Sequence, residues 1–377
     1  MRYIMKFGGT SVKNGGYARI ADIISQYRRH EVVAVVSAIK GVTDKLIEIT
    51  KVAERGNKRA IDEFMMEIRE LHREEARKSM GRIPKELEDQ LSKADRDLEH
   101  VLYGILYLRE ATPRSVDYVA SFGERYSAYI LASVLNERGI KSKAFTGGEA
   151  GITTDDSFGE ASPLMAITEA KTKERLLPLL ERGYVPVVGG YAGVTQSGIV
   201  TTLGRGGSDY TATILGVSLS ADEVWIWSDV DGLMTADPKI VPTARTIPEL
   251  TYKEALEMAA FGAKALHPRA LEPVYEKGIP VRIRNTFNPS HPGTVITSKP
   301  SKKFPSVVKA VALIRDVGML TVSGASMVGR PGTAAKIFST LARAGVNIMM
   351  ISQSVSESNV SMVVRRNVLA VSYTHLR

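Results

Sequence analysis

Short runs of apolar, mostly β-branched residues alternate with amphipathic segments and glycine loops over about residues 1–50 and 141–286. Nearly every position in these runs is apolar, which is typical of strands covered on both faces of a parallel or mixed sheet. Amphipathic helices between such strands predict an α/β layer sandwich. The strands that we expect are Tyr3–Phe7, Val32–Ser37, Val185–Val188, Ile199–Thr202, Glu223–Ser228 and Val281–Arg284.

Between residues 53 and 109 the pattern changes to that of charged helices. Apolar residues recur at helical spacing on both sides of a break at Gly81–Pro84. They are Ile61, Phe64, Met65, Ile68 and Leu71 before the break, and Leu87, Leu91, Leu98, Leu102 and Ile105 after it. We therefore expect two helices that can pair antiparallel. A solvated hairpin packed on the domain is favoured over a face for a coiled-coil partner.

The proline-rich segment 288–306 is typical of a linker, and a new βαββ pattern follows it. Its elements are expected as a strand over Val307–Val322, a helix over Gly332–Ala344, and strands over Val346–Gln353 and Val360–Val364. Residues 367–377 (NVLAVSYTHLR) are predicted to supply neither the helix nor the strand that would close a βαββαβ unit. We expect a domain over 1–300 and an incomplete one over 301–377, and it stays open whether 367–377 are native sequence.

Composition excludes several classes of protein. The 377 residues include no cysteine, which excludes a disulfide scaffold, a thiolate zinc site, an iron–sulfur cluster and a cysteine nucleophile. No apolar run approaches the roughly 18 residues of a membrane-spanning helix, so we expect a cytoplasmic protein that is neither secreted nor bound to a membrane. The net charge is +9, but the lysines and arginines are scattered among acidic residues. This distribution disfavours nucleic acid as a partner.

The first glycine loop directly follows the first expected strand. Lys6 supplies a point charge, and Gly8 and Gly9 let backbone amides approach a polyanion closely. Thr10 and Ser11 add hydroxyl donors. The loop is thus a phosphate cradle in outline.

A second glycine loop, residues 203–209 (LGRGGSD), links the strand ending at Thr202 to a helix. Ser208 and Asp209 stand where an N-cap and a first-turn acid belong, so a capped helix explains them without function. Arg205 among three glycines is not explained in that way. A guanidinium at the carboxyl end of a strand can grip a carboxylate with two hydrogen bonds, so we favour a binding role for Arg205.

Two further segments carry weaker indications. Residues 225–232 (WIWSDVDG) end a buried strand in two acids and a turn, a usual place for a nucleotide or metal, but Asp-Gly turns are common. Lys264 precedes Pro268, which is expected to open a helix. His267 is interpreted as a packing residue, and the histidines lack the spacing of a metal site.

These motifs together resemble the aspartokinase family over about residues 5–297. The matching segments are KFGGTS at the start, VSA at Ser37 with Thr43, SFGE ending at Glu124, TTLGRGGSD ending at Asp209, WSDVDG with DPK, and FGAKALHP. The βαββ tail resembles the ACT regulatory domain of the same enzymes. The resemblance implies a three-layer αβα sandwich, the amino acid kinase fold, followed by a partial α+β ACT-like domain of the ferredoxin-like βαββαβ type.

The activity implied by the resemblance is phosphoryl transfer from MgATP to the side-chain carboxylate of L-aspartate. The product is 4-phospho-L-aspartate, and the reaction is the first step of lysine, threonine and methionine biosynthesis. A carboxylate is ionised at neutral pH and needs no strong base, so the task is to hold two anions together and neutralise the transferred group. The resemblance implies ATP and Mg²⁺, with the metal held by the ATP phosphates and not by protein ligands.

The resemblance also implies roles for residues. Catalytic roles fall to Lys6, Asp209 and Lys264; aspartate binding to Ser37, Thr43, Glu124, Arg205 and Ser208; and ATP binding to Lys6, Gly8, Gly9, Ser228, Asp229, Met234, Lys239 and Lys264. Met234 and Lys239 depart from the family, which commonly has Tyr and Arg there. Methionine can still pack against a nucleotide base. Lysine keeps the positive charge of arginine but lacks the planar guanidinium that donates paired hydrogen bonds.

The ACT-like tail implies allosteric control by lysine or threonine and a homodimer or higher homo-oligomer. The effector-site candidates are Met327, Gly329, Gly332, Gln353 and Asn359. It is equally open that Gly329 and Gly332 only serve the turn.

Two alternatives to an aspartate kinase remain. The chain could be another amino acid kinase, such as acetylglutamate or glutamate kinase, or an amino-acid-sensing protein with a dead kinase domain. Intact Lys6, Glu124, Arg205, Asp209 and Lys264 argue against the second alternative.

Overall fold

The computed structural model describes residues 1–260, 266–300 and 308–376, over which the chain divides into the compact units Met1–Ala312 and Leu313–Arg377. The boundary falls later than the predicted 300/301 because residues after the linker prolines still attach to the first unit. Lys309 pairs with Glu254 at 2.6 Å, and the Val311 N–H donates to the Thr235 carbonyl.

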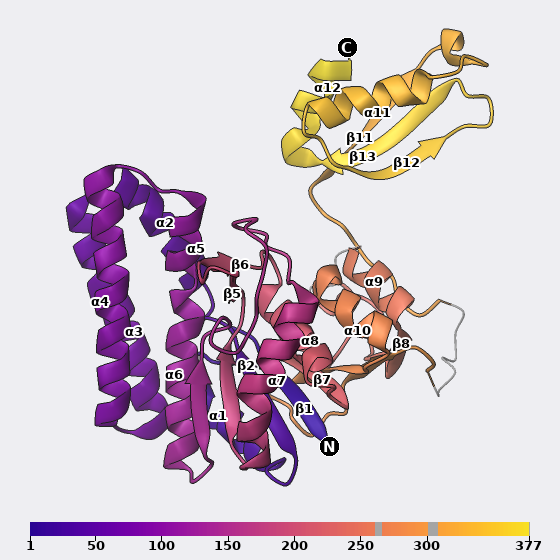
Figure 1. The fold of residues 1–377 in the computed structure, drawn as a ribbon. Coiled ribbons are helices and arrows are strands. Elements are labelled where there is room, and N and C mark those ends of the chain that lie inside the picture. The colour runs from indigo at the N-terminus through magenta and orange to yellow at the C-terminus, as the bar shows by residue number, and fades with distance from the viewer. Residues whose placement is uncertain (261–265, 301–307, 377) are drawn as a thin grey trace. The chain divides into compact units, whose positions relative to one another are not determined.

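Among the described residues of the large unit, eight strands form one mixed sheet (Figure 1). In spatial order they are β3 (Ser142–Phe145), β4 (Val185–Gly189), β2 (Glu31–Val36), β1 (Arg2–Phe7), β7 (Glu223–Ser228), β9 (Val281–Asn285), β10 (Thr294–Thr297) and β8 (Glu249–Thr251). Pairing is parallel from β3 to β9, and β10 is antiparallel to β9. The central strands are confirmed near their predicted bounds, whereas the short β3, β8 and β10 were not predicted.

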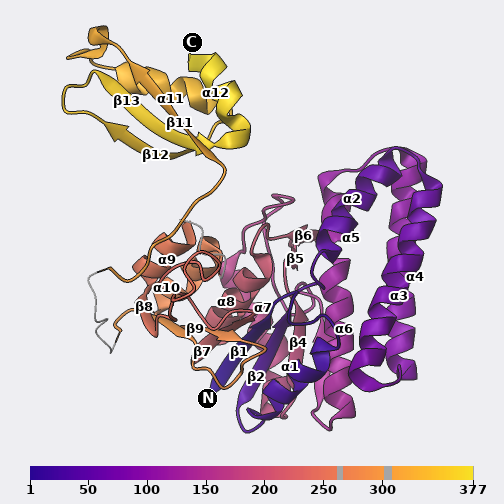
Figure 2. The same cartoon turned by 180° about the vertical axis from the view of Figure 1, so that it is seen from behind.

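Helices cover both faces of this sheet, so the predicted three-layer sandwich is confirmed (Figures 1 and 2). One face carries α1 (Gly16–Ser25) and α6 (Phe122–Glu137). The other carries α7 (Met165–Glu181), α8 (Gly207–Ser218), α9 (Tyr252–Ala260) and α10 (Glu272–Lys277), with the short helix η1 (Pro268–Leu271). Successive strand residues alternate between the two cores, as Ile4 and Met5 do, which is why the strands are apolar throughout.

The predicted strand Ile199–Thr202 forms, but outside the main sheet. It is β6 (Val200–Thr202), which pairs antiparallel with β5 (Ala192–Val194). This hairpin follows the carboxyl end of β4 and leads directly into the second glycine loop.

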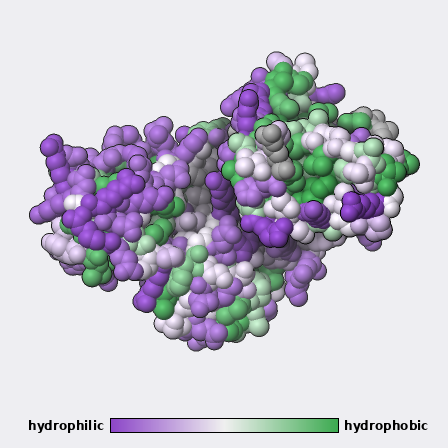
Figure 3. All heavy atoms as spheres, turned by 90° about the horizontal axis from the view of Figure 1, so that it is seen from above, coloured by the Kyte–Doolittle hydropathy of each residue, from purple (hydrophilic) through white to green (hydrophobic). Residues whose placement is uncertain are grey.

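The helical segment 53–109 contains the predicted pair, α3 (Lys58–Met80) and α4 (Lys85–Leu108), between α2 (Val42–Glu54) and α5 (Pro113–Ala120). Gly81 ends α3 in the left-handed region at φ 77°. The apolar stripes of both helices join the core beneath α1 and α6. The surface over the end of this hairpin is largely hydrophilic (Figure 3), as expected of a solvated hairpin.

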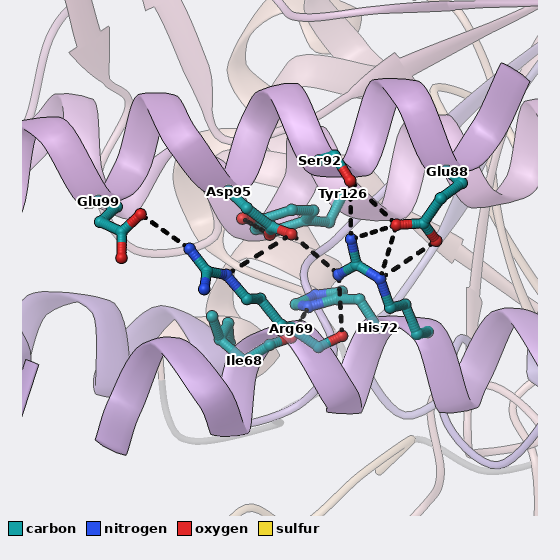
Figure 4. A network of polar contacts seen from close by, with 9 residues as sticks. Ile68, Arg69, His72, Glu88, Ser92, Asp95, Glu99 and Tyr126 are labelled. Atoms are coloured by element: carbon teal, nitrogen blue, oxygen red, sulfur yellow. Dashed lines mark hydrogen bonds and ion pairs between the residues drawn. The ribbon is translucent and has the colours of Figure 1, made fainter. Parts of the chain in front are cut away.

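A buried polar network joins the hairpin to α6 (Figure 4). Arg73 bonds Asp95 at 2.9 Å and Glu88 at 2.6 Å, and the Tyr126 hydroxyl donates to the other Asp95 oxygen at 2.8 Å. The His72 ring stacks on Tyr126 with the centroids 4.3 Å apart, and burial lowers the pKa of His72 to about 4. His72 is therefore neutral at pH 7 and adds no charge beside Arg73.

Replacing Asp95 with Ala should lower the free energy of unfolding by about 3 kcal/mol, because it leaves the largely buried Arg73 guanidinium without its buried partner. Glu99→Ala is the control, since Glu99 is more exposed and its pair with Arg69 should contribute less than about 1 kcal/mol. Denaturant titration measures both variants. Equal losses would contradict the assigned role of the buried pair.

The small unit is a three-stranded antiparallel sheet over its described residues, in the order β11 (Val317–Ser323), β13 (Asn359–Arg365), β12 (Ile348–Gln353). The short helix η2 (Ala325–Met327) and then α11 (Thr333–Arg343) follow β11. The predicted strand over Val307–Val322 was too long. Residues 308–316 form no strand, and the described apolar side chains Val308, Val311 and Leu313 are exposed.

The expectation that residues 367–377 form no helix is wrong. The structure has a 3₁₀ turn η3 (Arg366–Val368) and a helix α12 (Leu369–Leu376) that packs on α11 and β11. Leu369 lies so close to Gly318 that a Cβ there would be 2.7 Å from Leu369 Cδ2. The helix was missed because eight residues are too few for a clear apolar period, and contacts with α11 and β11 decide its conformation.

Candidate active site

The predicted site residues converge where parallel strands of the large unit end. Lys6 is in β1, Ser37 follows β2, and Ser228 ends β7. Because β2, β1 and β7 are adjacent and parallel, these ends share one edge of the sheet.

Lys6 and Asp209 form the centre of this edge. Lys6 Nζ lies 2.6 Å from Asp209 Oδ1, and both side chains are nearly buried. Asp209 is in the first turn of α8, so the glycine loop before that helix is adjacent to the ammonium group. The carboxylate thus holds the Lys6 ammonium group in place.

The first glycine loop lies against the neighbouring strands. The Gly8 N–H donates to the Trp227 carbonyl at 3.1 Å, and a Cβ on Gly8 would lie 3.6 Å from Lys6 Nζ. A Cβ on Gly9 would lie 2.7 Å from the Ala38 carbonyl oxygen, so a side chain there would displace the loop after β2. Ser11, predicted as a donor to phosphate, is buried and shares a 2.7 Å hydrogen bond with Thr286, so it supports the loop instead.

The second glycine loop presents Arg205 to solvent. Gly204 and Gly206 on either side are left-handed, at φ 76° and 72°. A Cβ on Gly206 would lie 2.3 Å from His267 Cβ. Glycine is therefore required at 206 both for the positive φ and for this close approach. The Arg205 side chain is exposed, which leaves its guanidinium accessible to a ligand.

Glu124 is a buried carboxylate in the first turn of α6, only 4% exposed. Burial raises its pKa to about 8, although backbone hydrogen bonds from Ala38 and from Glu124 itself, and the Lys6 charge, act in the opposite direction. Its Oε2 is buried without a hydrogen-bond partner in the described part of the chain. An unpaired buried acceptor is costly, so Glu124 is suited to receive a donor from a ligand.

The raised pKa of Glu124 predicts that the KM for an amino-acid substrate falls as pH rises from 6 to 8. At pH 6 the free carboxyl is protonated and neutral, and binding of an ammonium group requires that proton to leave. KM should therefore drop by up to about tenfold per pH unit before it levels off. Initial rates of the wild type and Glu124→Gln measure this, and the variant should be flat. A flat wild-type profile would contradict the assignment.

The structure gives local contacts for the other predicted substrate residues, Ser37, Thr43 and Ser208. A Cβ on Gly123 would meet Val42, beside Thr43 at the start of α2, and the Ser37 N–H donates to the Phe7 carbonyl. Ser208 is buried in the first turn of α8, against Gly190.

The predicted nucleotide residues are less closely gathered. Ser228 and Asp229 stand at the end of β7, beside Gly8. Met234 forms an isolated bridge with Thr246, and Lys239 is exposed, so the structure gives neither a contact with Lys6. Lys264 lies outside the described residues.

Sequence reasoning missed Asp117. Asp117, in α5, is 3% exposed and accepts from the Thr202 N–H at 2.8 Å, the Thr202 hydroxyl at 2.8 Å and the Gly159 N–H at 2.9 Å. It thus holds the end of β6, from which the second glycine loop begins. A lone acid on an amphipathic helix gives no sign of partners 42 and 85 residues away.

A separate hollow of about 310 Å³ lies in the small unit. It brings together four predicted effector residues, Met327, Gly329, Gly332 and Gln353, whereas Asn359 is not among its lining residues. Gly329 and Gly332 are both left-handed, as the turn interpretation requires, so the two roles are compatible. Arg330 and Glu357 also line the hollow and supply both signs of charge.

Comparisons with known proteins agree with this geometry. Residues 1–285 match the amino acid kinase family, and residues 320–374 match the ACT domain. "Lysine-sensitive aspartokinase 3" of Escherichia coli K12 is 34% identical over 93% of this chain and 76% of its own length. The chain belongs to the aspartokinases of the amino acid kinase family. The crystal structure of E. coli aspartokinase III in complex with aspartate and ADP superposes with a TM-score of 0.81, at 32% identity over 97% of this chain and 79% of that one.

Plant aspartokinases are also similar. "Aspartokinase 3, chloroplastic" of Arabidopsis thaliana is 38% identical over 93% of this chain, and this chain spans 62% of its length.

In the part of the chain that the structure describes, no helix is long and apolar enough to cross a membrane.

Proposed function

We propose that the chain is an aspartate kinase, which transfers the terminal phosphoryl group of MgATP to the side-chain carboxylate of L-aspartate. The Lys6–Asp209 pair carries the proposal, because it places a fixed ammonium group between the two glycine loops. The E. coli relative bound to aspartate and ADP supports the choice of both substrates.

The residues present suit the phosphates of a nucleotide. Gly8 leaves open the space beside Lys6 Nζ that a Cβ would enter, and α8 begins at the same place. Backbone N–H groups at a helix N-terminus and a lysine favour an anion. Mg²⁺ held on the ATP phosphates would neutralise charge on the transferred group.

The acceptor side suits a zwitterion that carries a second carboxylate. Arg205 would bind the α-carboxylate and Glu124 the amino group, which directs the side-chain carboxylate to Lys6. In the transition state Lys6 stabilises negative charge on the phosphoryl group, and Asp209 keeps Lys6 oriented. The carboxylate is itself the nucleophile and needs no proton removed.

Turnover with MgATP and L-aspartate, L-glutamate or N-acetylglutamate tests the proposal. We expect phosphorylation of aspartate with at least tenfold preference over the other acceptors. Preference for another acceptor would assign a different amino acid kinase activity, and no turnover with any of them would favour the sensing protein.

We further propose that the hollow of the small unit binds an amino-acid effector, lysine or threonine. Its volume and the opposite charges of Arg330 and Glu357 suit a zwitterion. The name of the E. coli relative, lysine-sensitive aspartokinase, favours lysine. Turnover measured with each amino acid, for the wild type and Gln353→Ala, tests this, and loss of wild-type inhibition in the variant is expected.

A homodimer or higher homo-oligomer through the small unit is proposed on the uncovered face of its sheet. Met319, Val363 and Met350 form one apolar row across the three described strands, on the face opposite α11. Met319 and Met350 are 68% and 51% exposed. Light scattering should give at least twice the 41.1 kDa chain mass.

The cytoplasmic location stays a prediction.

A further inference from the structure

The turn at the end of β9, residues 285–288, connects the two segments that we assign to the nucleotide. β9 is parallel and adjacent to β7, with Asn285 in register with Ser228, so both strands end at the same edge of the sheet. The Thr286 N–H donates to the Ser228 carbonyl at 2.9 Å. The Thr286 hydroxyl shares its 2.7 Å hydrogen bond with Ser11 of the first glycine loop, and both residues are fully buried. One turn thus contacts both the first glycine loop and the end of β7.

Asp231, in the loop after β7, accepts hydrogen bonds from both asparagines of this turn. Asn285 Nδ2 donates to Asp231 Oδ1 at 3.0 Å, and Asn288 Nδ2 donates to the same oxygen at 3.1 Å. The orientation of the Asn285 amide is fixed at its other end, because Asn285 Oδ1 accepts from the Phe287 N–H at 2.9 Å. The turn therefore holds Asp231 through the capacity of its carboxylate to accept hydrogen bonds.

These hydrogen bonds fix the chain on both sides of Asp229, which the resemblance assigns to ATP. Ser228, immediately before it, is held by Thr286. Asp231, two residues after it, is held by the two asparagines. Asp229 itself is exposed and is therefore accessible to a ligand. The turn after β9 thus determines where this acid stands relative to the first glycine loop.

The chain after Asp231 is held by a different element, β10. Gly232 has a φ of 126°, and a Cβ on it would lie 2.5 Å from Thr294 Oγ1. Thr294 Oγ1 accepts from the Leu233 N–H at 2.8 Å, and its hydroxyl donates to the Ile247 carbonyl at 2.6 Å. Because β10 already fixes the loop from residue 232 onward, the asparagines of the turn act on the part of the loop that faces the candidate site.

We propose that Asn285 and Asp231 are a pair of positioning residues for the nucleotide. Their hydrogen bond holds the loop after β7 beside the first glycine loop, so that both segments contact one ATP molecule. The proposal rests on the proposed function, and neither side chain is assigned a contact with ATP. Because the hydrogen bond is made before the ligand arrives, less conformational entropy is lost when ATP binds.

Asn285→Asp tests the pair, because aspartate keeps the acceptor for Phe287 but replaces the donor to Asp231 with a second carboxylate oxygen. The dissociation constant of MgATP, measured by titration calorimetry without amino acid, should rise about tenfold, which is what one hydrogen bond to a charged group contributes. The KM for L-aspartate in initial-rate kinetics should change less than twofold. An unchanged dissociation constant for MgATP, or an equal rise in the KM for aspartate, would overturn the proposal.

Exchanging the two residues distinguishes a hydrogen bond from a requirement for charge. In the double variant Asp231→Asn/Asn285→Asp the amide and the carboxylate change places, so an N–H···O hydrogen bond forms between them again. The new amide oxygen at 231 can still accept from Asn288. The dissociation constant of MgATP should return to within about threefold of the wild-type value. A double variant that binds as weakly as Asn285→Asp alone would refute the positioning role, because the charge at 231 would then be what ATP binding needs.

Asn136→Asp is the matched control. Asn136 in α6 accepts from the Ser142 N–H at 2.8 Å and donates to the Ser142 carbonyl at 3.1 Å, so the same substitution removes one donor there. Ser142 begins β3, which places this contact at the edge of the sheet opposite the candidate site. The control should lower only the melting temperature, and an equal loss of MgATP affinity in it would refute the proposal. A wild type that binds MgATP but phosphorylates no amino acid would refute the proposed function, whereas the pair is judged by the MgATP constants alone.

Discussion

Replacing Lys6 with Met should lower kcat for aspartate phosphorylation by about 10³-fold, the upper range for loss of one preorganised group that stabilises transition-state charge. Lys6 Nζ is the cation that the structure fixes between the two glycine loops, 2.6 Å from Asp209. Methionine keeps most of the side-chain volume, so the loss should come from the missing charge. Single-turnover rates at saturating MgATP and aspartate measure the effect on the chemical step.

Lys45→Met is the control for Lys6, because Lys45 in α2 forms an exposed ion pair with Glu67 in α3. That variant should keep kcat within twofold. The melting temperature of the Lys6 variant should also be recorded, since Asp209 loses its partner and becomes a nearly buried, unpaired carboxylate. A folded Lys6→Met protein with kcat within tenfold of the wild type would remove Lys6 from the mechanism.

Arg205→Ala should raise the KM for L-aspartate about 100-fold, because two charge-assisted hydrogen bonds to the α-carboxylate would be lost. The KM for MgATP should stay within twofold, since Arg205 is assigned to the amino acid alone. Arg205→Lys should recover only part of the affinity, because lysine keeps the charge without the planar fork. Initial rates with one substrate varied at a time separate the two constants.

Arg82→Ala is the control for Arg205, because Arg82 is 75% exposed and pairs with Glu137 on the surface. It should leave both Michaelis constants unchanged. Equal increases for aspartate and ATP in Arg205→Ala would mean that the second glycine loop supports the whole site and does not bind the α-carboxylate.

Much of the candidate site could be predicted because its residues are adjacent in sequence. Gly8 and Gly9 follow a strand, Arg205 lies between glycines, and Asp209 opens a helix, so local rules about strand ends and helix N-termini suffice. Asp117 and the partners of Asp231 could not be found in this way. Asp117 reaches Thr202 across 85 residues, and the asparagines that hold Asp231 are 54 and 57 residues away.

The sequence by itself determined the α/β layering, the helical hairpin and the two glycine loops, because each follows from apolar periodicity or from residues close together in the chain. Only the tertiary structure decided that Glu124 is buried deeply enough to have its pKa raised to about 8, and that α12 forms against Gly318. Desolvation and packing depend on which distant segments close over a residue. The reactive groups could therefore be named from the sequence, but their protonation and orientation could not.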